Sequence, residues 1–168
     1  MYLFRDVALV DIKVLNKVSD ELKKQHLTIA TAESCTGGLL AHQLTNVSGS
    51  SAYFDRGVVS YTNTSKTELL DVPKTLLKTY GAVSEQVAQA MAEGIRTRAN
   101  VDIGASTTGI AGPTGGTKDK PVGLVYIGVA TSRRVVVKRF LFSGDRLTVK
   151  DQACEAALQV LLETLTNR

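Results

Sequence analysis

Leu27-Thr-Ile-Ala-Thr-Ala-Glu-Ser-Cys-Thr-Gly-Gly38 is the stretch that decides how this chain folds. Its first residues are apolar and β-prone, whereas the run that follows, Leu39-Leu-Ala-His-Gln-Leu44, is helix-prone. The sequence therefore predicts a strand over 27–32 and a helix over 36–45, with Ser34 at the junction. Unpaired N–H groups at a helix start favour a phosphate or a developing oxyanion. Ser34 is thus a candidate nucleophile beside an anion site, and an ordinary helix cap is an equally good interpretation.

Helical and strand-like patterns alternate on both sides of this junction. Helical spacing of apolar residues covers 11–25, 64–70, 74–80, 84–99 and the residues from 145 onward, and strand-like runs cover 54–61, 102–107, 122–130 and 135–142. A tight connection at Ser132-Arg133 makes the last two strands an antiparallel hairpin. This order predicts a three-layer α/β/α sandwich with a mixed, mostly parallel sheet.

Size and composition indicate one globular domain that covers residues 1–168. A chain of 168 residues, 43% of them hydrophobic, is long enough to bury a core without disulfide staples. The two cysteines, Cys35 and Cys154, match neither a disulfide framework nor a metal-binding spacing, which indicates reduced thiols in the cytoplasm. No apolar run approaches the ~20 residues that cross a bilayer, and residues 1–6 lack the pattern of a signal peptide.

The net charge of +4 is small and dispersed. The densest basic cluster, Arg133-Arg134 with Lys138-Arg139, flanks apolar strand residues and is typical of the exposed margin of a strand pair. Aromatic residues are sparse, and the chain has no zinc-finger or aromatic RNA-binding motif. We therefore expect neither nucleic acid nor a membrane as a partner.

A glycine-rich loop, Gly109-Ile-Ala-Gly-Pro-Thr-Gly-Gly116, follows the strand-like run over 102–107. Gly109, Gly112, Gly115 and Gly116 permit positive φ and let backbone amides approach a ligand closely. The loop matches neither the P-loop nor the dinucleotide-binding pattern, and a plain flexible connector is the alternative interpretation. Ligands of such sheets gather beyond the carboxyl ends of the strands, so we expect this loop and Ser34 at the same edge.

A base for Ser34 is harder to find, because the chain has two histidines. His26 lies at a helix-to-strand junction and His42 about two turns into the helix after Ser34, and neither position suits a base. Lysine also activates serine when burial or nearby positive charge lowers its pKa. Lys66, a few residues after a predicted strand end at Tyr61, is the best candidate; an exposed helix lysine is the alternative.

Two further charged residues are candidates for contacts with a substrate. Glu33 immediately precedes Ser34, and either orients a substrate amide or caps the strand end. Arg146, in Gly144-Asp-Arg146, lies at a predicted helix start, and either binds a phosphate or pairs with a nearby carboxylate.

These motifs, taken in order, resemble the CinA carboxy-terminal domain family, whose stand-alone members are nicotinamide-nucleotide amidases. The resemblance runs from about Val18 to the end of the chain. It rests on 31–38, Gly49-Ser-Ser-Ala-Tyr-Phe54, Gly57-Val-Val-Ser-Tyr61 with Asn63 and Lys66, Gly81-Ala-Val-Ser-Glu85, 109–116, Lys120-Pro-Val-Gly123 and Gly144-Asp-Arg146. No cofactor-type domain precedes these motifs, so we expect the stand-alone form.

The resemblance implies hydrolysis of nicotinamide mononucleotide to nicotinic acid mononucleotide and ammonia, without a metal or cofactor. It implies a serine amidase mechanism that uses lysine in place of histidine. Carried onto this chain, Ser34 is the nucleophile, Lys66 the base and Tyr61 its assistant. The amides of residues 36–38 (Thr36, Gly37 and Gly38) and the loop over 109–116 are then expected to hold the oxyanion or the ribose phosphate.

Two other functions fit the same motifs. A non-catalytic nucleotide-binding or regulatory module of this fold uses the glycine-rich loops but not Ser34, since fold alone does not determine function. A DNA-acting protein is suggested by the competence-related family name, but the mild charge argues against it. Small α/β enzymes often form closed symmetric oligomers, so we expect a homo-oligomer, with a dimer as the first choice.

Overall fold

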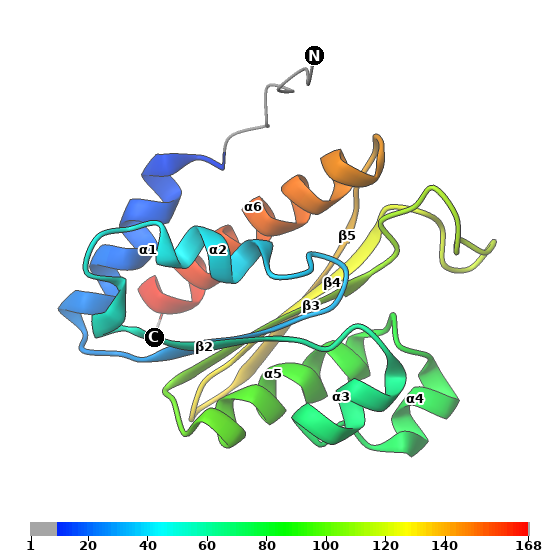
Figure 1. Ribbon diagram of the computed structural model, residues 1–168, viewed down its shortest axis with the longest axis horizontal. Coiled ribbons are helices and arrows are strands. Elements are labelled where there is room, and N and C mark those ends of the chain that lie inside the picture. Colours follow the sequence, from blue (N-terminus) through cyan, green and yellow to red (C-terminus); the bar gives the residue numbers. More distant parts are fainter. Residues whose placement is uncertain (1–9, 168) are drawn as a thin grey trace, which may run out of the picture.

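The computed structural model describes residues 10–167, which fold around a five-stranded sheet with the order β2-β1-β3-β4-β5 (Figure 1). The strands are β1 (Ile29–Glu33), β2 (Phe54–Val59), β3 (Ile103–Gly109), β4 (Leu124–Ala130) and β5 (Val135–Leu141). β1 pairs in parallel with β2 and β3, and β4 runs antiparallel to β3 and β5. All strands except β4 therefore point the same way, which confirms the mixed, mostly parallel sheet and the antiparallel hairpin.

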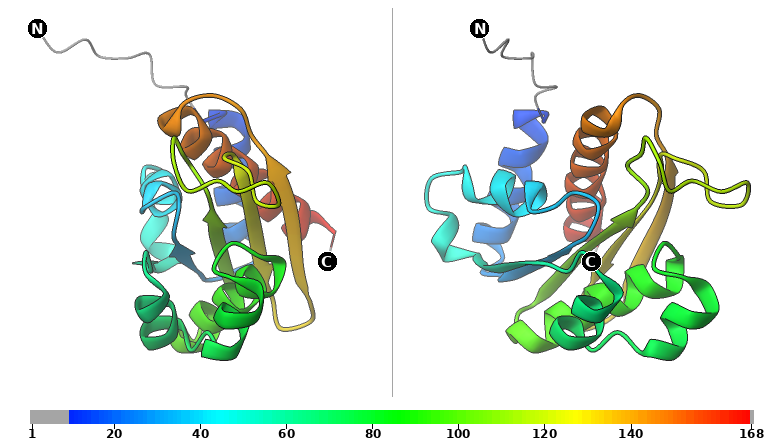
Figure 2. Two further views of the ribbon diagram at one scale, coloured as in Figure 1. Left: turned by 90° about the vertical axis from the view of Figure 1, so that its right-hand side faces the viewer. Right: turned by 45° about the vertical axis from the view of Figure 1, so that its right-hand side comes forward.

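Helices cover both faces of this sheet (Figures 1 and 2). They are α1 (Ile12–Lys24), α2 (Leu39–Thr45), η1 (Ser50–Ala52), α3 (Asn63–Leu70), α4 (Lys74–Tyr80), α5 (Glu85–Ala99) and α6 (Arg146–Thr166). One layer contains α1, α2 and α6, and the opposite layer contains α3, α4 and α5. The three-layer sandwich is therefore confirmed. Two apolar cores separate the layers, one on each face of the sheet.

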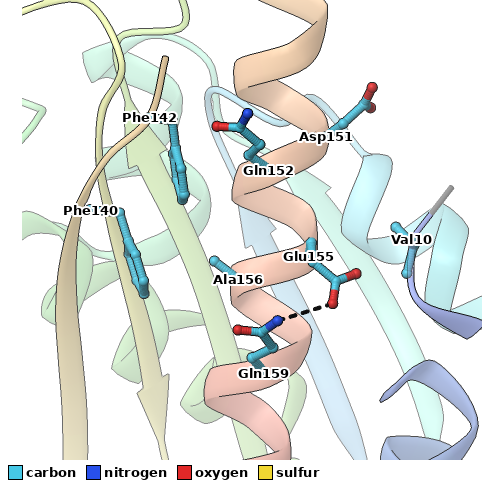
Figure 3. A pocket seen from close by; sticks show the side chains of 8 residues that line it. All are labelled: Val10, Phe140, Phe142, Asp151, Gln152, Glu155, Ala156 and Gln159. Carbon is cyan, nitrogen blue, oxygen red and sulfur yellow. Dashed lines mark hydrogen bonds between the residues drawn. The ribbon is translucent and has the colours of Figure 1, made fainter. Parts of the chain in front are cut away.

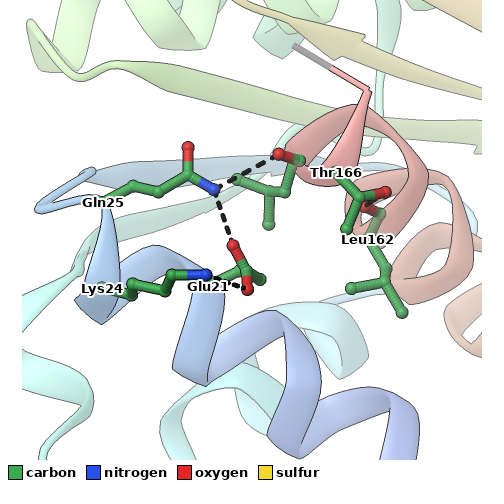
Figure 4. A network of polar contacts seen from close by, with 6 residues as sticks. Glu21, Lys24, Gln25, Leu162 and Thr166 are labelled. Atoms are coloured by element: carbon green, nitrogen blue, oxygen red, sulfur yellow. Dashed lines mark hydrogen bonds and ion pairs between the residues drawn. The ribbon is translucent and has the colours of Figure 1, made fainter.

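The helix bounds follow from local side-chain chemistry. Asp11 caps α1 by accepting a hydrogen bond from the amide of Lys13 at 2.8 Å, and Ser84 caps α5 in the same way. Gln25, just after α1, donates to Glu21 at 2.8 Å and to the carbonyl of Leu165 at 3.2 Å (Figure 4). These contacts join the end of α1 to the end of α6, which fixes the two helices of this layer against each other.

One boundary differs from the expectation in a way that matters for the site. The helix predicted to begin at Thr36 begins at Leu39 instead. Gly37 and Gly38 have φ angles of 65° and 98°, and this left-handed backbone does not continue a helix. The chain therefore makes a turn, rather than a helical start, directly after Ser34.

The hairpin end of the sheet carries the basic cluster. Arg133, Arg134 and Arg139 are exposed, and Lys138 pairs with Glu163 on α6. The predicted exposed margin of a strand pair is confirmed. Within residues 10–167, no helix is both long and apolar enough to cross a membrane. The run over 1–6, which lacks a signal-peptide pattern, lies outside the described residues.

Candidate active site

Ser34 and Lys66 meet because two parallel strands end side by side. Glu33, the last residue of β1, pairs in register with Val59, the last residue of β2. Beyond β2, the chain turns into α3, whose start is fixed by a reciprocal capping pair of Thr62 and Ser65. The first turn of α3 directs Lys66 back over the strand ends, and its Nζ lies 3.0 Å from Ser34 Oγ.

Lys66 is buried with 1% of its surface exposed, and carbonyl oxygens supply its other contacts. Its Nζ donates to the carbonyl of Ser60 at 2.8 Å and to that of Tyr61 at 3.4 Å. Burial lowers the pKa of Lys66 from 10.5 to about 8, and the nearby Cys35 opposes this shift to a smaller extent. A substantial fraction of Lys66 is therefore neutral near pH 8, which is the form that accepts a proton from a serine.

A cleft of about 250 Å³ opens onto this pair. Its walls come from the turn after β1, the start of α3, the loops before α5 and after β3, and the start of α6. The lining residues are Ser34, Cys35, Tyr61, Lys66, Ala82, Val83, Thr108, Gly109, Ile110, Ala111, Gly112, Thr114, Gly115 and Arg146. The cleft thus brings together Ser34, Lys66, Tyr61, Arg146 and three of the four predicted loop glycines.

Gly116 and residues 36–38 (Thr36, Gly37 and Gly38) lie outside this lining. A Cβ on Gly116 would come within 2.8 Å of the amide nitrogen of Val122, so Gly116 allows two loop segments to pack closely. Gly112 has a similar close approach, since a Cβ there would lie 2.5 Å from a methyl group of Val122, and its φ is 81°. These glycines shape the loop whether or not they contact a ligand.

Glu33 points away from the cleft, and the structure corrects its predicted contact with substrate. Its carboxylate lies beneath the start of α2 and accepts from the amides of Gly38, Leu40 and Ala41 at 2.8–3.1 Å. Thr36 Oγ1 donates to the same carboxylate at 2.6 Å. Successive side chains of a strand point to opposite faces, so Glu33 and Ser34 separate. Glu33 is therefore a positioning residue that holds the turn carrying Ser34.

This arrangement removes one of the expected oxyanion donors and leaves the others as predictions. The Gly38 amide is bound by Glu33 and is not directed at a ligand. The amide of Ser34 donates to the carbonyl of Thr107 at 2.9 Å. The amides of Cys35, Thr36 and Gly37 remain as candidate donors to an oxyanion.

Replacing Glu33 with glutamine is expected to destabilise the fold by about 2–4 kcal/mol, because both carboxylate oxygens accept hydrogen bonds from buried groups. Glutamine keeps one acceptor and turns an N–H₂ group toward other donors. The matched control is Glu68→Gln, on the exposed face of α3, which should change stability by less than about 0.5 kcal/mol. Urea unfolding measures both, and equal small effects would contradict the positioning role.

Tyr61 and Arg146 contact each other across the mouth of the cleft. Arg146 donates to the Tyr61 hydroxyl at 2.7 Å and to the Gly112 carbonyl at 2.8 Å. Tyr61 contacts Lys66 through its backbone carbonyl, and the residue as a whole is 57% exposed. The backbone carbonyl of Tyr61 therefore helps to hold Lys66 in place. A catalytic role for the Tyr61 hydroxyl stays a prediction.

Sequence reasoning missed two contributors to the site. The Ser60 carbonyl is the shortest contact of the Lys66 ammonium group, and Thr107 links β3 to the turn after β1. Thr107 Oγ1 lies 2.7 Å from Thr36 Oγ1. Thr107 pairs in register with Glu33. Because neighbouring parallel strands end at the same edge of a sheet, Thr107 could have been predicted to lie near Ser34. A backbone carbonyl such as that of Ser60 leaves no signal in residue identity.

The other features considered in the sequence analysis and a second groove lie outside this cleft. This larger groove, about 370 Å³, lies between β5 and α6 (Figure 3). It is lined by Phe140, Phe142 and Gln159 among others, and it shares no lining residue with the cleft at Ser34. His26 and His42 are exposed and lie outside the cleft lining. In residues 10–167, no group of three or more His, Cys, Asp or Glu side chains is placed to hold a metal ion.

Comparison with known proteins identifies the family of this chain. The model of the CinA C-terminal domain matches residues 11–165. A protein of Thermoanaerobacter pseudethanolicus is 55% identical over 140 residues, which is 83% of this chain and 34% of that protein. A CinA-like protein of Syntrophus aciditrophicus is 51% identical over 141 residues, with the same 83% and 34% coverage.

The solved structures agree with the sequence comparison. The competence/damage inducible protein CihA of Agrobacterium tumefaciens is 38% identical, with a TM-score of 0.88 over 92% of this chain and 94% of that one. This chain spans about a third of the length of the two curated relatives above, but nearly the whole of the CihA chain. The chain therefore belongs to the CinA C-terminal domain family.

Proposed function

We propose that this domain is an amidohydrolase that converts nicotinamide mononucleotide and water to nicotinic acid mononucleotide and ammonia, and that it acts in the recycling of pyridine nucleotides in the cytoplasm. The observation that carries the proposal is the contact of a buried lysine, Lys66, with the hydroxyl of Ser34 at 3.0 Å. Burying a lysine is costly unless the charge is paired or lost, and the contacts of Lys66 contain no carboxylate within the described residues. Such a lysine is suited to accept a proton.

The proposed reaction has two halves. Ser34 Oγ attacks the carboxamide carbon, and its proton moves to Lys66 Nζ. The amides of Cys35, Thr36 or Gly37 donate to the developing oxyanion. Lys66 then returns the proton to the departing nitrogen, so that ammonia leaves and the nicotinoyl group stays on Ser34 as an ester. Water, deprotonated by the same lysine, cleaves the ester and releases the acid.

The rest of the cleft provides for binding. The loop over 109–115 forms one wall, and Arg146 holds it through the Gly112 carbonyl. In this proposal the Gly109–Gly115 wall lies against the ribose. A homodimer remains a separate prediction, which sedimentation of the purified protein would test.

The experiment that tests the function is the conversion of nicotinamide mononucleotide by purified wild-type protein in a buffer with a metal chelator. Ammonia and nicotinic acid mononucleotide should appear in equal amounts. A folded protein that binds the nucleotide by calorimetry but releases no ammonia would instead support the nucleotide-binding module of the same fold.

A further inference from the structure

The groove between β5 and α6 has an apolar floor (Figure 3). Phe140 and Phe142 project from the same face of the sheet, and their rings stack with centroids 5.4 Å apart. Ala156 of α6 faces them across the groove. Both phenylalanines are only partly buried. A surface on which aromatic rings stay partly open to solvent is suited to pack against another apolar group.

The described chain begins at this groove. Val10 lines the groove, and the amide of Asp11 donates to Glu155 Oε2 on α6 at 2.9 Å. Asp11 also caps α1 through its side chain, so the contact with Glu155 ties the start of α1 to the middle of α6. Residues 1–9 therefore join the folded domain at the edge of the groove.

Residues 1–9 have the composition of a segment that packs against an apolar surface. Seven of the nine are apolar or aromatic, in the run Met1-Tyr-Leu-Phe-Arg-Asp-Val-Ala-Leu9. Removing such side chains from water is favourable roughly in proportion to their apolar area. The groove also has an acidic rim, formed by Asp151 and Glu155. Arg5, the basic side chain of the run, is complementary to this rim in charge.

The run is long enough to cover the groove. The α6 residues that line the groove extend from Asp151 to Gln159, which is about 12 Å along the helix. An extended run over residues 1–9 reaches up to about 30 Å from its attachment, so about half of it is sufficient. Because the run is attached at the edge of the groove, its local concentration there exceeds that of a free partner. This favours the segment of the same chain over that of a second copy.

We propose that residues 1–9 fold back over α6 and occupy the groove between β5 and α6 of the same chain. The apolar side chains of the run pack against Phe140 and Phe142, and Arg5 lies beside the acidic rim. The segment then covers the aromatic rings that the rest of the domain leaves partly open. This docking is independent of the proposed amidase reaction, because the groove shares no lining residue with the cleft at Ser34.

Trypsin cleavage after Arg5 measures whether the segment is docked. Proteolysis of a docked segment follows the fraction of molecules in which the segment is open. In the wild-type protein, this cleavage should be roughly ten- to a hundredfold slower than in a free peptide of the same sequence. In a variant that combines Leu3→Ser with Phe4→Ser, the rate should come within about threefold of the peptide with the same two changes. Phe142→Ser in the groove should have the same effect.

A matched control and the segment variant separate docking from general loss of stability. Leu141→Ser removes an exposed apolar side chain from the opposite face of β5 and should keep the protection of Arg5. Phe142→Ser also removes packing within the domain, so the variant with Leu3→Ser and Phe4→Ser decides the question. Wild-type cleavage at the rate of the free peptide would overturn the proposal. Protection that survives these two changes in the segment would overturn it as well.

A mixing experiment distinguishes docking within one chain from exchange between two copies. The Phe142→Ser protein has an intact segment, whereas the protein with Leu3→Ser and Phe4→Ser has an intact groove. The two proteins are unfolded together, refolded as a mixture and treated with trypsin. Docking within one chain predicts that Arg5 of the Phe142→Ser protein is cleaved as fast in the mixture as alone. Recovery of its protection in the mixture would place the segment in the groove of a second copy and overturn the proposal.

Discussion

Replacement of Ser34 by alanine should lower the rate of ammonia release from nicotinamide mononucleotide by roughly 10⁴-fold or more, the scale seen when the nucleophile of a serine hydrolase is removed. Ser34 Oγ is the atom that lies 3.0 Å from Lys66 Nζ in the cleft, and alanine removes it while keeping the backbone of the turn. The turn should survive, since Glu33 and Thr107 hold it from the other face of the sheet.

Binding and folding serve as controls for this loss. The Ser34→Ala protein should bind the mononucleotide within about threefold of wild type, because the proposed ribose contacts come from the loop after β3. Ser132→Ala, at the exposed hairpin turn, should keep full activity. A Ser34→Ala protein with more than a tenth of the wild-type rate would exclude Ser34 as the nucleophile.

Replacement of Lys66 by methionine is expected to lower kcat by roughly 10²–10⁴-fold, which is the usual contribution of a positioned general base. Methionine fills the buried volume of the lysine stem but cannot accept a proton. Lys66→Arg should be as inactive as Lys66→Met, since a guanidinium stays protonated at every accessible pH. Steady-state ammonia release measures both variants.

The arginine variant gives the sharper result. A lysine that acts only as a fixed positive charge, for example to hold an oxyanion, would be replaced in part by arginine. Recovery of more than about a tenth of the wild-type rate in Lys66→Arg would therefore contradict a role as base. Lys17→Met removes a lysine at an exposed position of α1 and serves as the control. It should leave the rate of ammonia release unchanged.

The layers of the fold could be predicted from the sequence, because the spacing of apolar residues indicates which face of each helix or strand is buried. It also indicated the meeting of Ser34 and Lys66, since both follow the ends of strands that pair in parallel. It left two roles open for Glu33, a substrate contact and a cap at the strand end, and the hydrogen bonds of its carboxylate to the start of α2 favour a local structural role. The alternation of side chains along β1 already separates Glu33 from Ser34. The glycine pair after Ser34 likewise favoured a turn over the helix start that was predicted there.

Contacts between segments that are distant in the sequence could not be predicted from local sequence patterns. The bond between Arg146 and Tyr61 joins residues 85 positions apart, and the approach of Lys150 to Gly37 depends on how α6 packs over the turn after β1. The two carbonyls that hold Lys66 are backbone groups, which every residue type supplies. Such features are set by tertiary packing, and residue identity alone carries little information about them.

The measurement that tests the central claim most directly is kcat/KM for ammonia release by the wild-type protein between pH 6.5 and 10. The active form of Lys66 is neutral, and burial lowers its pKa from 10.5 to about 8. Activity should therefore rise close to tenfold for each pH unit well below 8, bend near that pH and level off above it. A rate limited by chemistry that stays flat from pH 6.5 to 9, or falls as the pH rises, would contradict neutral Lys66 as the base for Ser34.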